Sequence, residues 1–259
     1  MRAAAALAGV VLAISGCTTS AATEQRVPGQ PATGPSTGPI TVFAAASLAG
    51  TFAELARSFE AAHPGSRVTL SLGPSSGLAQ QIVQGAPADV FASASASTMD
   101  VVTSAGAAAA AKTFATNMMQ VAVPPANEAG VSGVSDLARR DVKVALCQQK
   151  VPCGEAAAKV LAKAGVRVTP VTLEVDVRAV LAKVQLDEVD AGIVYVTDVK
   201  AAAGKVRGIP IPAGVNASTD YRIAVLDRSE RAEIARQFVD HVLSPQGRDV
   251  LARAGFSPP

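Results

Sequence analysis

The chain has 259 residues and a formal net charge of +2, with 23 Lys and Arg against 21 Asp and Glu. This balance argues against a polyanionic partner such as a nucleic acid. With no tryptophan, two tyrosines and seven phenylalanines, the chain offers little stacking surface, so sugars, bases and aromatic ligands are poor candidates.

The first 39 residues are predicted to direct and tether the chain rather than to belong to its fold. Residues 3–14 form an apolar run that is too short to span a bilayer as a permanent helix. The sequence ISGC that ends at Cys17 resembles the lipobox of bacterial lipoproteins. It predicts a signal peptide over residues 1–16 and an acylated Cys17 that anchors the protein to the cell membrane on its extracytoplasmic side. An ordinary signal peptide that contains a cysteine is the alternative. The rest of residues 17–39 is rich in Thr, Ser, Pro and Gly, which is typical of a flexible tether.

From residue 40 on, short β-rich runs alternate with Ala-rich segments of helical period. The expected strands lie near residues 40–43, 67–72, 89–92, 118–123, 142–146, 168–173, 192–196, 206–211 and 223–226. The expected helices lie near residues 48–62, 76–84, 98–104, 154–164, 177–186, 231–242 and 245–254. This alternation predicts an α/β fold in which mostly parallel sheets carry helices on both faces.

So many strands would be unusual in one open sheet of a chain this long, so two lobes with smaller sheets are expected. The segments that cross between the lobes are predicted near residues 121–125 and 212–221. Lobe 1 would begin with residues 40–121, lobe 2 would comprise residues 122–217, and residues 218–259 would return to lobe 1. Ligands of such folds bind beyond the carboxyl ends of the strands, where helices begin.

Two serines stand where a predicted strand ends and a helix begins. Ser47 follows three alanines in an N-cap position, and residue 50, where a capping box needs Glu or Gln, is glycine. The N–H groups of the helix start and its dipole would then be free to attract an anion. Ser75 lies in the turn GPSSG, whose N–H groups can face one point. A plain helix cap at Ser47 and a common Ser-Gly turn at Ser75 are the alternatives.

Cys147 and Cys153 remain once Cys17 is assigned to the anchor. In an exported protein such a pair is expected to form a disulfide. Metal binding is less favoured, because neither His63 nor His241 lies near the pair in the sequence. Cys153 follows a proline that suits a helix start, so its N–H could also face a ligand. A purely structural disulfide is the alternative, and the two roles are compatible.

Two further positions lie in the second half of the chain. Asp176 is a plausible N-cap, which would leave the N–H of Val177 free at a helix start. Arg178 is the obvious charged candidate, although an arginine at this point of a helix is usually solvated. Tyr195 ends a strand of buried character, where its hydroxyl needs a partner. A tyrosine paired with protein groups is the alternative.

These motifs together resemble a known family. ITVFAAASL, SSGLAQQI with GAPADVFASAS, VPCG, DVRAVL and GIVY occur in the same order, over essentially all of residues 40–259, as in the periplasmic molybdate-binding proteins of ABC transporters. The resemblance implies the two-lobed, type II-like periplasmic binding protein fold, with the ligand in the cleft. It also implies a monomer without enzymatic activity or cofactor, which binds molybdate or tungstate and delivers it to a membrane permease.

The resemblance also implies the ligand-binding positions. Ser47 and Ser75 would contribute hydroxyl and N–H groups, Cys153 and Val177 their N–H groups, and Tyr195 its hydroxyl. These residues would hold the molybdenum as its oxyanion. Many relatives have VPAG where this chain has VPCG, a change that a backbone donor tolerates.

Four other functions are weighed against this one. None of the five positions supplies a carboxylate to accept a proton, so hydrogen phosphate should be rejected, whereas sulfate or another deprotonated oxyanion remains the alternative ligand. Ferric-iron binders use paired tyrosines and carboxylates, whereas this chain has only two tyrosines, Tyr195 and Tyr221. A serine enzyme would need a nucleophile elbow, and neither Ser47 nor Ser75 lies in a G-x-S-x-G sequence. A surface lipoprotein that only makes interactions is the last alternative.

Overall fold

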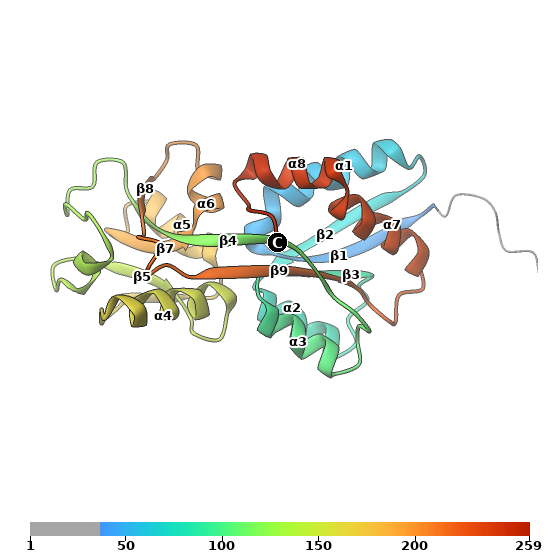
Figure 1. The fold of residues 1–259 in the computed structure, drawn as a ribbon, viewed down its shortest axis with the longest axis horizontal. Coiled ribbons are helices and arrows are strands. Elements are labelled where there is room, and N and C mark those ends of the chain that lie inside the picture. The colour runs from blue at the N-terminus through green and yellow to red at the C-terminus, as the bar shows by residue number, and fades with distance from the viewer. Residues whose placement is uncertain (1–36) are drawn as a thin grey trace, which may run out of the picture. The chain divides into compact units, whose positions relative to one another are not determined.

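The strands of this computed structural model, which describes residues 37–259, form one continuous sheet (Figure 1). They are β1 (Pro39–Ala45), β2 (Arg67–Gly73), β3 (Val90–Ser93), β4 (Lys112–Val123), β5 (Val144–Cys147), β6 (Thr172–Glu174), β7 (Ala191–Tyr195), β8 (Arg207–Pro210) and β9 (Ser218–Val225). Their order is β2-β1-β3-β9-β4-β7-β5-β6, and β8 pairs with β4 beside this path. The predicted signal peptide, Cys17 and nearly all of the predicted tether lie outside the described residues.

The helices fill the connections between the strands. They are η1 (Ala46–Leu48), α1 (Ala49–Ala62), α2 (Ser75–Val83), α3 (Ala96–Ser104), η2 (Val134–Ala138), α4 (Pro152–Ala164), α5 (Val177–Gln185), α6 (Val196–Ala201), α7 (Ala232–Leu243) and α8 (Pro245–Ala254). Sequence signals mark several ends. Pro152 begins α4, and Gly165, with a φ of 66°, ends it in the left-handed conformation that glycine adopts without a steric penalty. Among residues 37–259, no helix combines the length and the apolar character needed to cross a membrane.

The predicted two-lobed α/β fold is confirmed, but the expectation of two separate sheets is wrong. β4 and β9 pair antiparallel from Lys112↔Ile223 to Met118↔Ser218, and β4 then continues into pairing with β7 and β8. The lobes are therefore joined by the strands themselves. Residues 112–117 of β4 lie outside the strand expected near residues 118–123, because Lys, Thr and Asn interrupt their apolar pattern.

Each lobe is built on parallel strand pairs. β1 pairs with β2 and β3 in lobe 1, and β5 pairs with β6 and β7 in lobe 2, in each case parallel. The strands β1, β2, β5, β6 and β7 are each followed by a helix, η1, α2, α4, α5 and α6 respectively. The carboxyl ends of parallel strands meet at one edge of a sheet, so these helix starts gather where the two lobes face each other.

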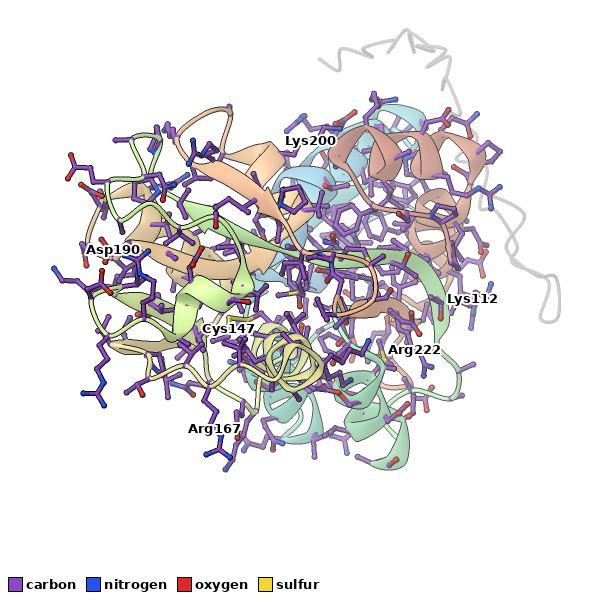
Figure 2. All side chains as sticks on the ribbon, turned by 60° about the vertical axis from the view of Figure 1, so that its left-hand side comes forward. Lys112, Cys147, Arg167, Asp190, Lys200 and Arg222 are labelled. Atoms are coloured by element: carbon purple, nitrogen blue, oxygen red, sulfur yellow. A yellow bond between two sulfur atoms is a disulfide. The ribbon has the colours of Figure 1, made fainter. Side chains whose placement is uncertain are left out.

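Separate hydrophobic cores stabilise the two lobes. The core of lobe 2 contains buried residues between Met119 and Ala217. The main core of lobe 1 combines residues between Ile40 and Ala115 with residues between Tyr221 and Phe256, so the last helices, α7 and α8, cover lobe 1 (Figure 1). The exact lobe boundaries, at residues 121/122 and 217/218, stay a prediction. Charged side chains such as Arg167 and Lys200 lie exposed at the periphery, whereas Cys147 lies inside (Figure 2).

Candidate functional site

A small cavity lies between the lobes where helices begin. Its volume is about 20 Å³, whereas pockets for organic ligands usually measure about 300–1,000 Å³. The cavity is lined by Ala45, Ala46, Ser47, Gly73, Pro74, Ser75, Ala94, Val151, Pro152, Cys153, Val175, Asp176, Val177 and Tyr195. All five positions singled out from the sequence are among these residues, although they come from five separate segments. The size restricts this site to a small ion.

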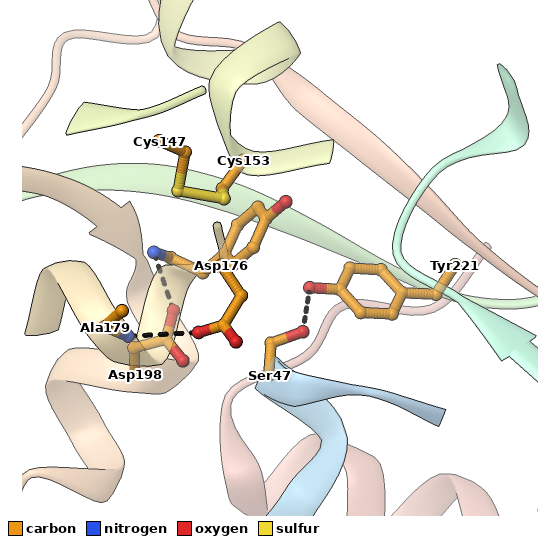
Figure 3. The surroundings of a disulfide bond; sticks show 8 residues. Ser47, Cys147, Cys153, Asp176, Ala179, Asp198 and Tyr221 are labelled. Carbon is orange, nitrogen blue, oxygen red and sulfur yellow. Dashed lines mark hydrogen bonds between the residues drawn. A yellow bond between two sulfur atoms is a disulfide. The ribbon is translucent and has the colours of Figure 1, made fainter. Parts of the chain in front are cut away.

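Ser47 faces the cavity from lobe 1, at the end of β1. The sequence places it at an N-cap, but this prediction is wrong, because Ser47 is the middle residue of η1, which leads into α1. Alanine favours helical backbone, so the helical turn begins before the serine. The Ser47 Oγ lies 2.9 Å from the Oη of Tyr221, a residue of β9 (Figure 3). The alanines before Ser47 are buried and leave its backbone accessible to a small ligand.

Ser75 is the second contribution of lobe 1 and is the first residue of α2. Its side chain is buried, and its Oγ accepts a hydrogen bond from the backbone N–H of Ala94 at 3.2 Å. Because that bond uses a lone pair of the oxygen, the hydroxyl proton of Ser75 remains available for another acceptor. No side chain caps the start of α2, so its first N–H groups are also available.

The start of α4 brings Cys153 to the cavity from lobe 2. The predicted disulfide between Cys147 and Cys153 is present, with the two Cα atoms 5.7 Å apart (Figure 3). No side chain of the described residues caps this helix, and the N–H of Cys153, in the first turn, has no intrahelical acceptor. A Cβ atom on Gly154 would lie 1.9 Å from the carbonyl oxygen of Gln148. Only glycine therefore lets the disulfide loop close tightly over the helix start.

Val177 is the first residue of α5, and the predicted N-cap is present beside it. The Asp176 Oδ1 accepts from the N–H of Ala179 at 3.0 Å (Figure 3). This cap satisfies Ala179 and leaves the N–H of Val177 free of an intrahelical partner. The side chain of Arg178 is exposed and lines a neighbouring, larger cavity instead. The charged alternative at this position is thus not brought to the site.

Tyr195 ends β7 with its side chain 1% exposed. Its hydroxyl makes no hydrogen bond to any other group among the described residues. Burial raises the pKa of Tyr195 well above its ordinary value, so the hydroxyl keeps its proton and can donate it. A buried unpaired hydroxyl costs about 1–3 kcal/mol, which indicates that the hydroxyl has a function. An acceptor in the cavity would pair it.

Asp198 lies beside the site and was missed in the sequence. This buried residue of α6, labelled in Figure 3, accepts from the backbone N–H of Tyr195 at 3.0 Å, which caps the helix start. Burial raises the pKa of Asp198 to about 7, although its bond to Tyr195 acts in the opposite direction. The signal in the sequence is the spacing of the two residues, because a capping box places an acidic residue three positions after the cap.

The electrostatic character of the cavity follows from its lining. Among residues 37–259, no Lys or Arg lines it, and the Oδ1 of the Asp176 carboxylate accepts from the N–H of Ala179. The remaining polar groups are hydroxyls and the N–H groups of four helix starts, which together favour negative charge. Within residues 37–259, His, Cys, Asp and Glu side chains form no group of three or more that could hold a metal ion. The arrangement is suited to a small anion held by neutral donors.

A direct contact joins the lobes beside the cavity. The Ser97 Oγ, on α3 of lobe 1, donates to Glu155 Oε2, on α4 of lobe 2, at 2.7 Å. Glu155 also pairs with Lys159, and this hydrogen bond, with that from Ser97, lowers the pKa of its carboxyl group. The first turn of α4 therefore touches the opposite lobe as well as the cavity.

Comparison with known proteins agrees with this geometry. Residues 40–257 match the profile of a family described as "Bacterial extracellular solute-binding protein". The chain is 41% identical over 221 residues to "Molybdate-binding protein ModA" of Mycobacterium tuberculosis, covering 85% of each chain. It is 32% identical over 235 residues to the protein of that name from Escherichia coli, covering 85% of this chain and 89% of the relative. The predicted resemblance is confirmed.

Solved structures share the fold. The periplasmic molybdate-binding protein of Azotobacter vinelandii aligns with a TM-score of 0.72 at 22% identity, over 85% of this chain and 99% of that one. The sulfate-binding protein SubI of Mycobacterium tuberculosis aligns with a TM-score of 0.75 at 18% identity, over 85% of this chain and 87% of that one. At these identities the comparison supports the fold alone and does not choose between the two oxyanions.

Proposed function

Because the chain belongs to the bacterial extracellular solute-binding protein family, we propose that it binds molybdate, or the closely similar tungstate, outside the cytoplasm and delivers it to the permease of an ABC transporter. The observation that carries the proposal is the convergence of five segments from both lobes on one small cavity without a cationic side chain. The names of the relatives at 41% and 32% identity point to the same ligand.

In this proposal lobe 1 contributes Ser47 and Ser75, each through its hydroxyl and N–H. Lobe 2 contributes the N–H groups of Cys153 and Val177 and the hydroxyl of Tyr195. Neutral donors can hold a dianion when several of them converge, because charge-assisted hydrogen bonds are stronger than neutral ones and the buried site has a low dielectric. Since each lobe contributes only part of the set, a bound oxyanion stabilises the closed arrangement of the lobes.

Selection among oxyanions follows from whether the ligand carries a proton that needs an acceptor. Molybdate, tungstate and sulfate carry no proton near neutral pH, whereas hydrogen phosphate carries one that needs an acceptor. The proposed ligand groups are donors, and the Oδ1 of the nearby Asp176 carboxylate accepts from the N–H of Ala179. Hydrogen phosphate would therefore find no carboxylate among the proposed ligand groups to accept its proton, which penalises its binding.

Competition calorimetry on the purified mature protein tests the proposal. Molybdate and tungstate should bind with similar affinity, and sulfate should bind more weakly. Tight binding of sulfate without a preference for molybdate would overturn the assignment in favour of the sulfate alternative, which the fold shared with a sulfate-binding protein also allows. Ser47→Ala serves as the matched variant, because it removes one proposed ligand hydroxyl without adding a group.

Membrane anchoring through Cys17 and a monomeric state belong to the same proposal. Acyl chains on Cys17 would keep the binding lobes near the permease on the outer side of the cell membrane. Mass spectrometry of the native N-terminus would detect the acyl chains, and Cys17→Ser should release the protein from the membrane fraction. Light scattering of the soluble form should give the mass of one chain.

A further inference from the structure

A row of buried polar groups adjoins Ser47 and does not itself line the cavity. Tyr221 on β9 is 0% exposed, and its Oη lies 2.9 Å from the Ser47 Oγ (Figure 3). Asn117 on β4 is 1% exposed, and its Nδ2 lies 3.5 Å from the Tyr221 Oη and 2.8 Å from the Thr197 Oγ1. β4 and β9 are the paired strands that join the two lobes. Tyr221, Asn117 and Thr197 lie outside the proposed ligand set.

The direction of the hydrogen bonds in this row can be derived from Asn117. Its Oδ1 accepts from the backbone N–H of Met118 at 3.0 Å, which orients the amide so that its NH₂ group faces Thr197 and Tyr221. An amide nitrogen can only donate, so the Tyr221 oxygen accepts from Asn117. The Tyr221 proton is then directed to the Ser47 Oγ, the other partner of this hydroxyl.

Ser47 consequently accepts from Tyr221, and its own proton points to the remaining neighbour, the cavity. Burial raises the pKa of Tyr221, so the phenol stays protonated and continues to donate. Ser75 is in the same situation, because its Oγ accepts from the backbone N–H of Ala94. The Oγ atoms of both lobe 1 serines thus accept a hydrogen bond from a donor group of the protein. At Ser75 this donor is backbone, whereas at Ser47 it is a side chain that can be replaced.

We propose that Tyr221, oriented by Asn117, is a positioning residue that makes Ser47 a hydrogen-bond donor to the bound oxyanion and disfavours its accepting a hydrogen bond from a protonated one. The inference rests on the proposed function and deepens it. If Ser47 accepted a hydrogen bond from hydrogen phosphate and no longer donated to the ligand, its own hydroxyl proton would turn to Tyr221. The Tyr221 proton would then have to turn from Ser47 toward the NH₂ group of Asn117, which cannot accept a hydrogen bond.

A double-mutant cycle on molybdate binding tests the inference. Tyr221→Phe keeps the ring, which packs edge-on against Phe114 and Phe256, and removes only the hydroxyl. We expect about a tenfold loss of molybdate affinity. In a Ser47→Ala background the same change should alter the affinity less than about twofold, since coupled residues are not additive. Equal losses in both backgrounds would overturn the proposal.

Selectivity supplies a second readout that a purely structural role would not change. In Tyr221→Phe the Ser47 hydroxyl can also accept, so the affinity for phosphate relative to molybdate should rise about tenfold at pH 7. An unchanged ratio contradicts the proposal. Thr98→Val is the control, because it removes a buried hydroxyl of α3 outside this row and should leave both affinities unchanged. If Tyr221→Phe does not fold, Asn117→Ala replaces it in the same cycle.

Titration of the wild-type protein distinguishes a failure of the proposed function from a failure of the role proposed for Tyr221. If the wild-type protein does not bind molybdate, the proposed function fails. The cycle is then measured with sulfate, which is also fully deprotonated at this pH. If the wild type binds molybdate and the cycle is additive, the proposed function stands and the role of Tyr221 fails.

Discussion

Replacement of Tyr195 by phenylalanine should weaken ligand binding without weakening the fold. Tyr195 carries one of the two buried side-chain polar atoms without a hydrogen-bond partner among the described residues, and it lines the cavity. Phenylalanine preserves the ring and its edge-on contact with Tyr221, at a centroid distance of 6.0 Å. The substitution therefore removes a hydroxyl and little else.

The magnitudes follow from the state of that hydroxyl. In the ligand-free protein it is buried and unpaired, so its removal should leave the free energy of unfolding unchanged or raise it by about 1 kcal/mol. In the complex it would donate to a charged acceptor, a bond that contributes about 1.5–3 kcal/mol. The dissociation constant for molybdate should then rise roughly 10- to 150-fold. The affinity for molybdate should thus fall, whereas the free energy of unfolding should stay the same or rise.

Calorimetric titration with molybdate and urea unfolding of the ligand-free protein measure the two quantities. Ser66→Ala is a matched control, because the Ser66 Oγ is the other buried atom without a partner and does not line the cavity. This control should leave the affinity unchanged. If Tyr195→Phe lost stability and kept its affinity, its hydroxyl would serve the fold and the site would be wrongly assigned.

The remaining predictions concern a buried carboxyl group, the disulfide and the contact between the lobes. The pKa of Asp198 is raised to about 7 from 3.8, so its contribution to stability is complete below about pH 4 and is lost as the pH rises through 7, by up to about 4 kcal/mol. Asp198→Asn should flatten the dependence of urea unfolding on pH between about 4 and 7, and an unchanged slope would show that other groups cause that dependence. Replacing Cys147 and Cys153 together by alanine should lower the free energy of unfolding by about 2 kcal/mol, because the bond closes a short loop. Molybdate affinity should stay within about threefold, since Cys153 is proposed to bind through its N–H; a hundredfold loss would show that the disulfide shapes the site. Ser97→Ala should speed molybdate release a few-fold in stopped-flow measurements, because it removes a hydrogen bond to Glu155 across the lobes and such changes act mainly on dissociation rates. An unchanged rate would mean that this bond does not hold the lobes together.

Local signals in the sequence were sufficient to predict much of the candidate site. A helix start depends on its own few residues, so Pro152 and the cap at Asp176 could be identified from their neighbours. The cap predicted at Ser47 is wrong, because the helical turn already begins at Ala46, which a simple cap pattern does not reveal. Convergence of the five positions on one cavity was implied by the family motifs and could not be derived from spacing alone.

The sequence by itself determined the alternation of strands and helices, the bare alanines and hydroxyls at the helix starts, and the family to which the chain belongs. The tertiary structure decided which distant groups meet. Ser47 and Tyr221 lie 174 positions apart, and the register of β4 against β9 brings Asn117 to the same place. Periodicity in a strand reports which face is buried but not which strand lies beside it. The partners that orient a ligand group therefore become visible only once the sheet is assembled.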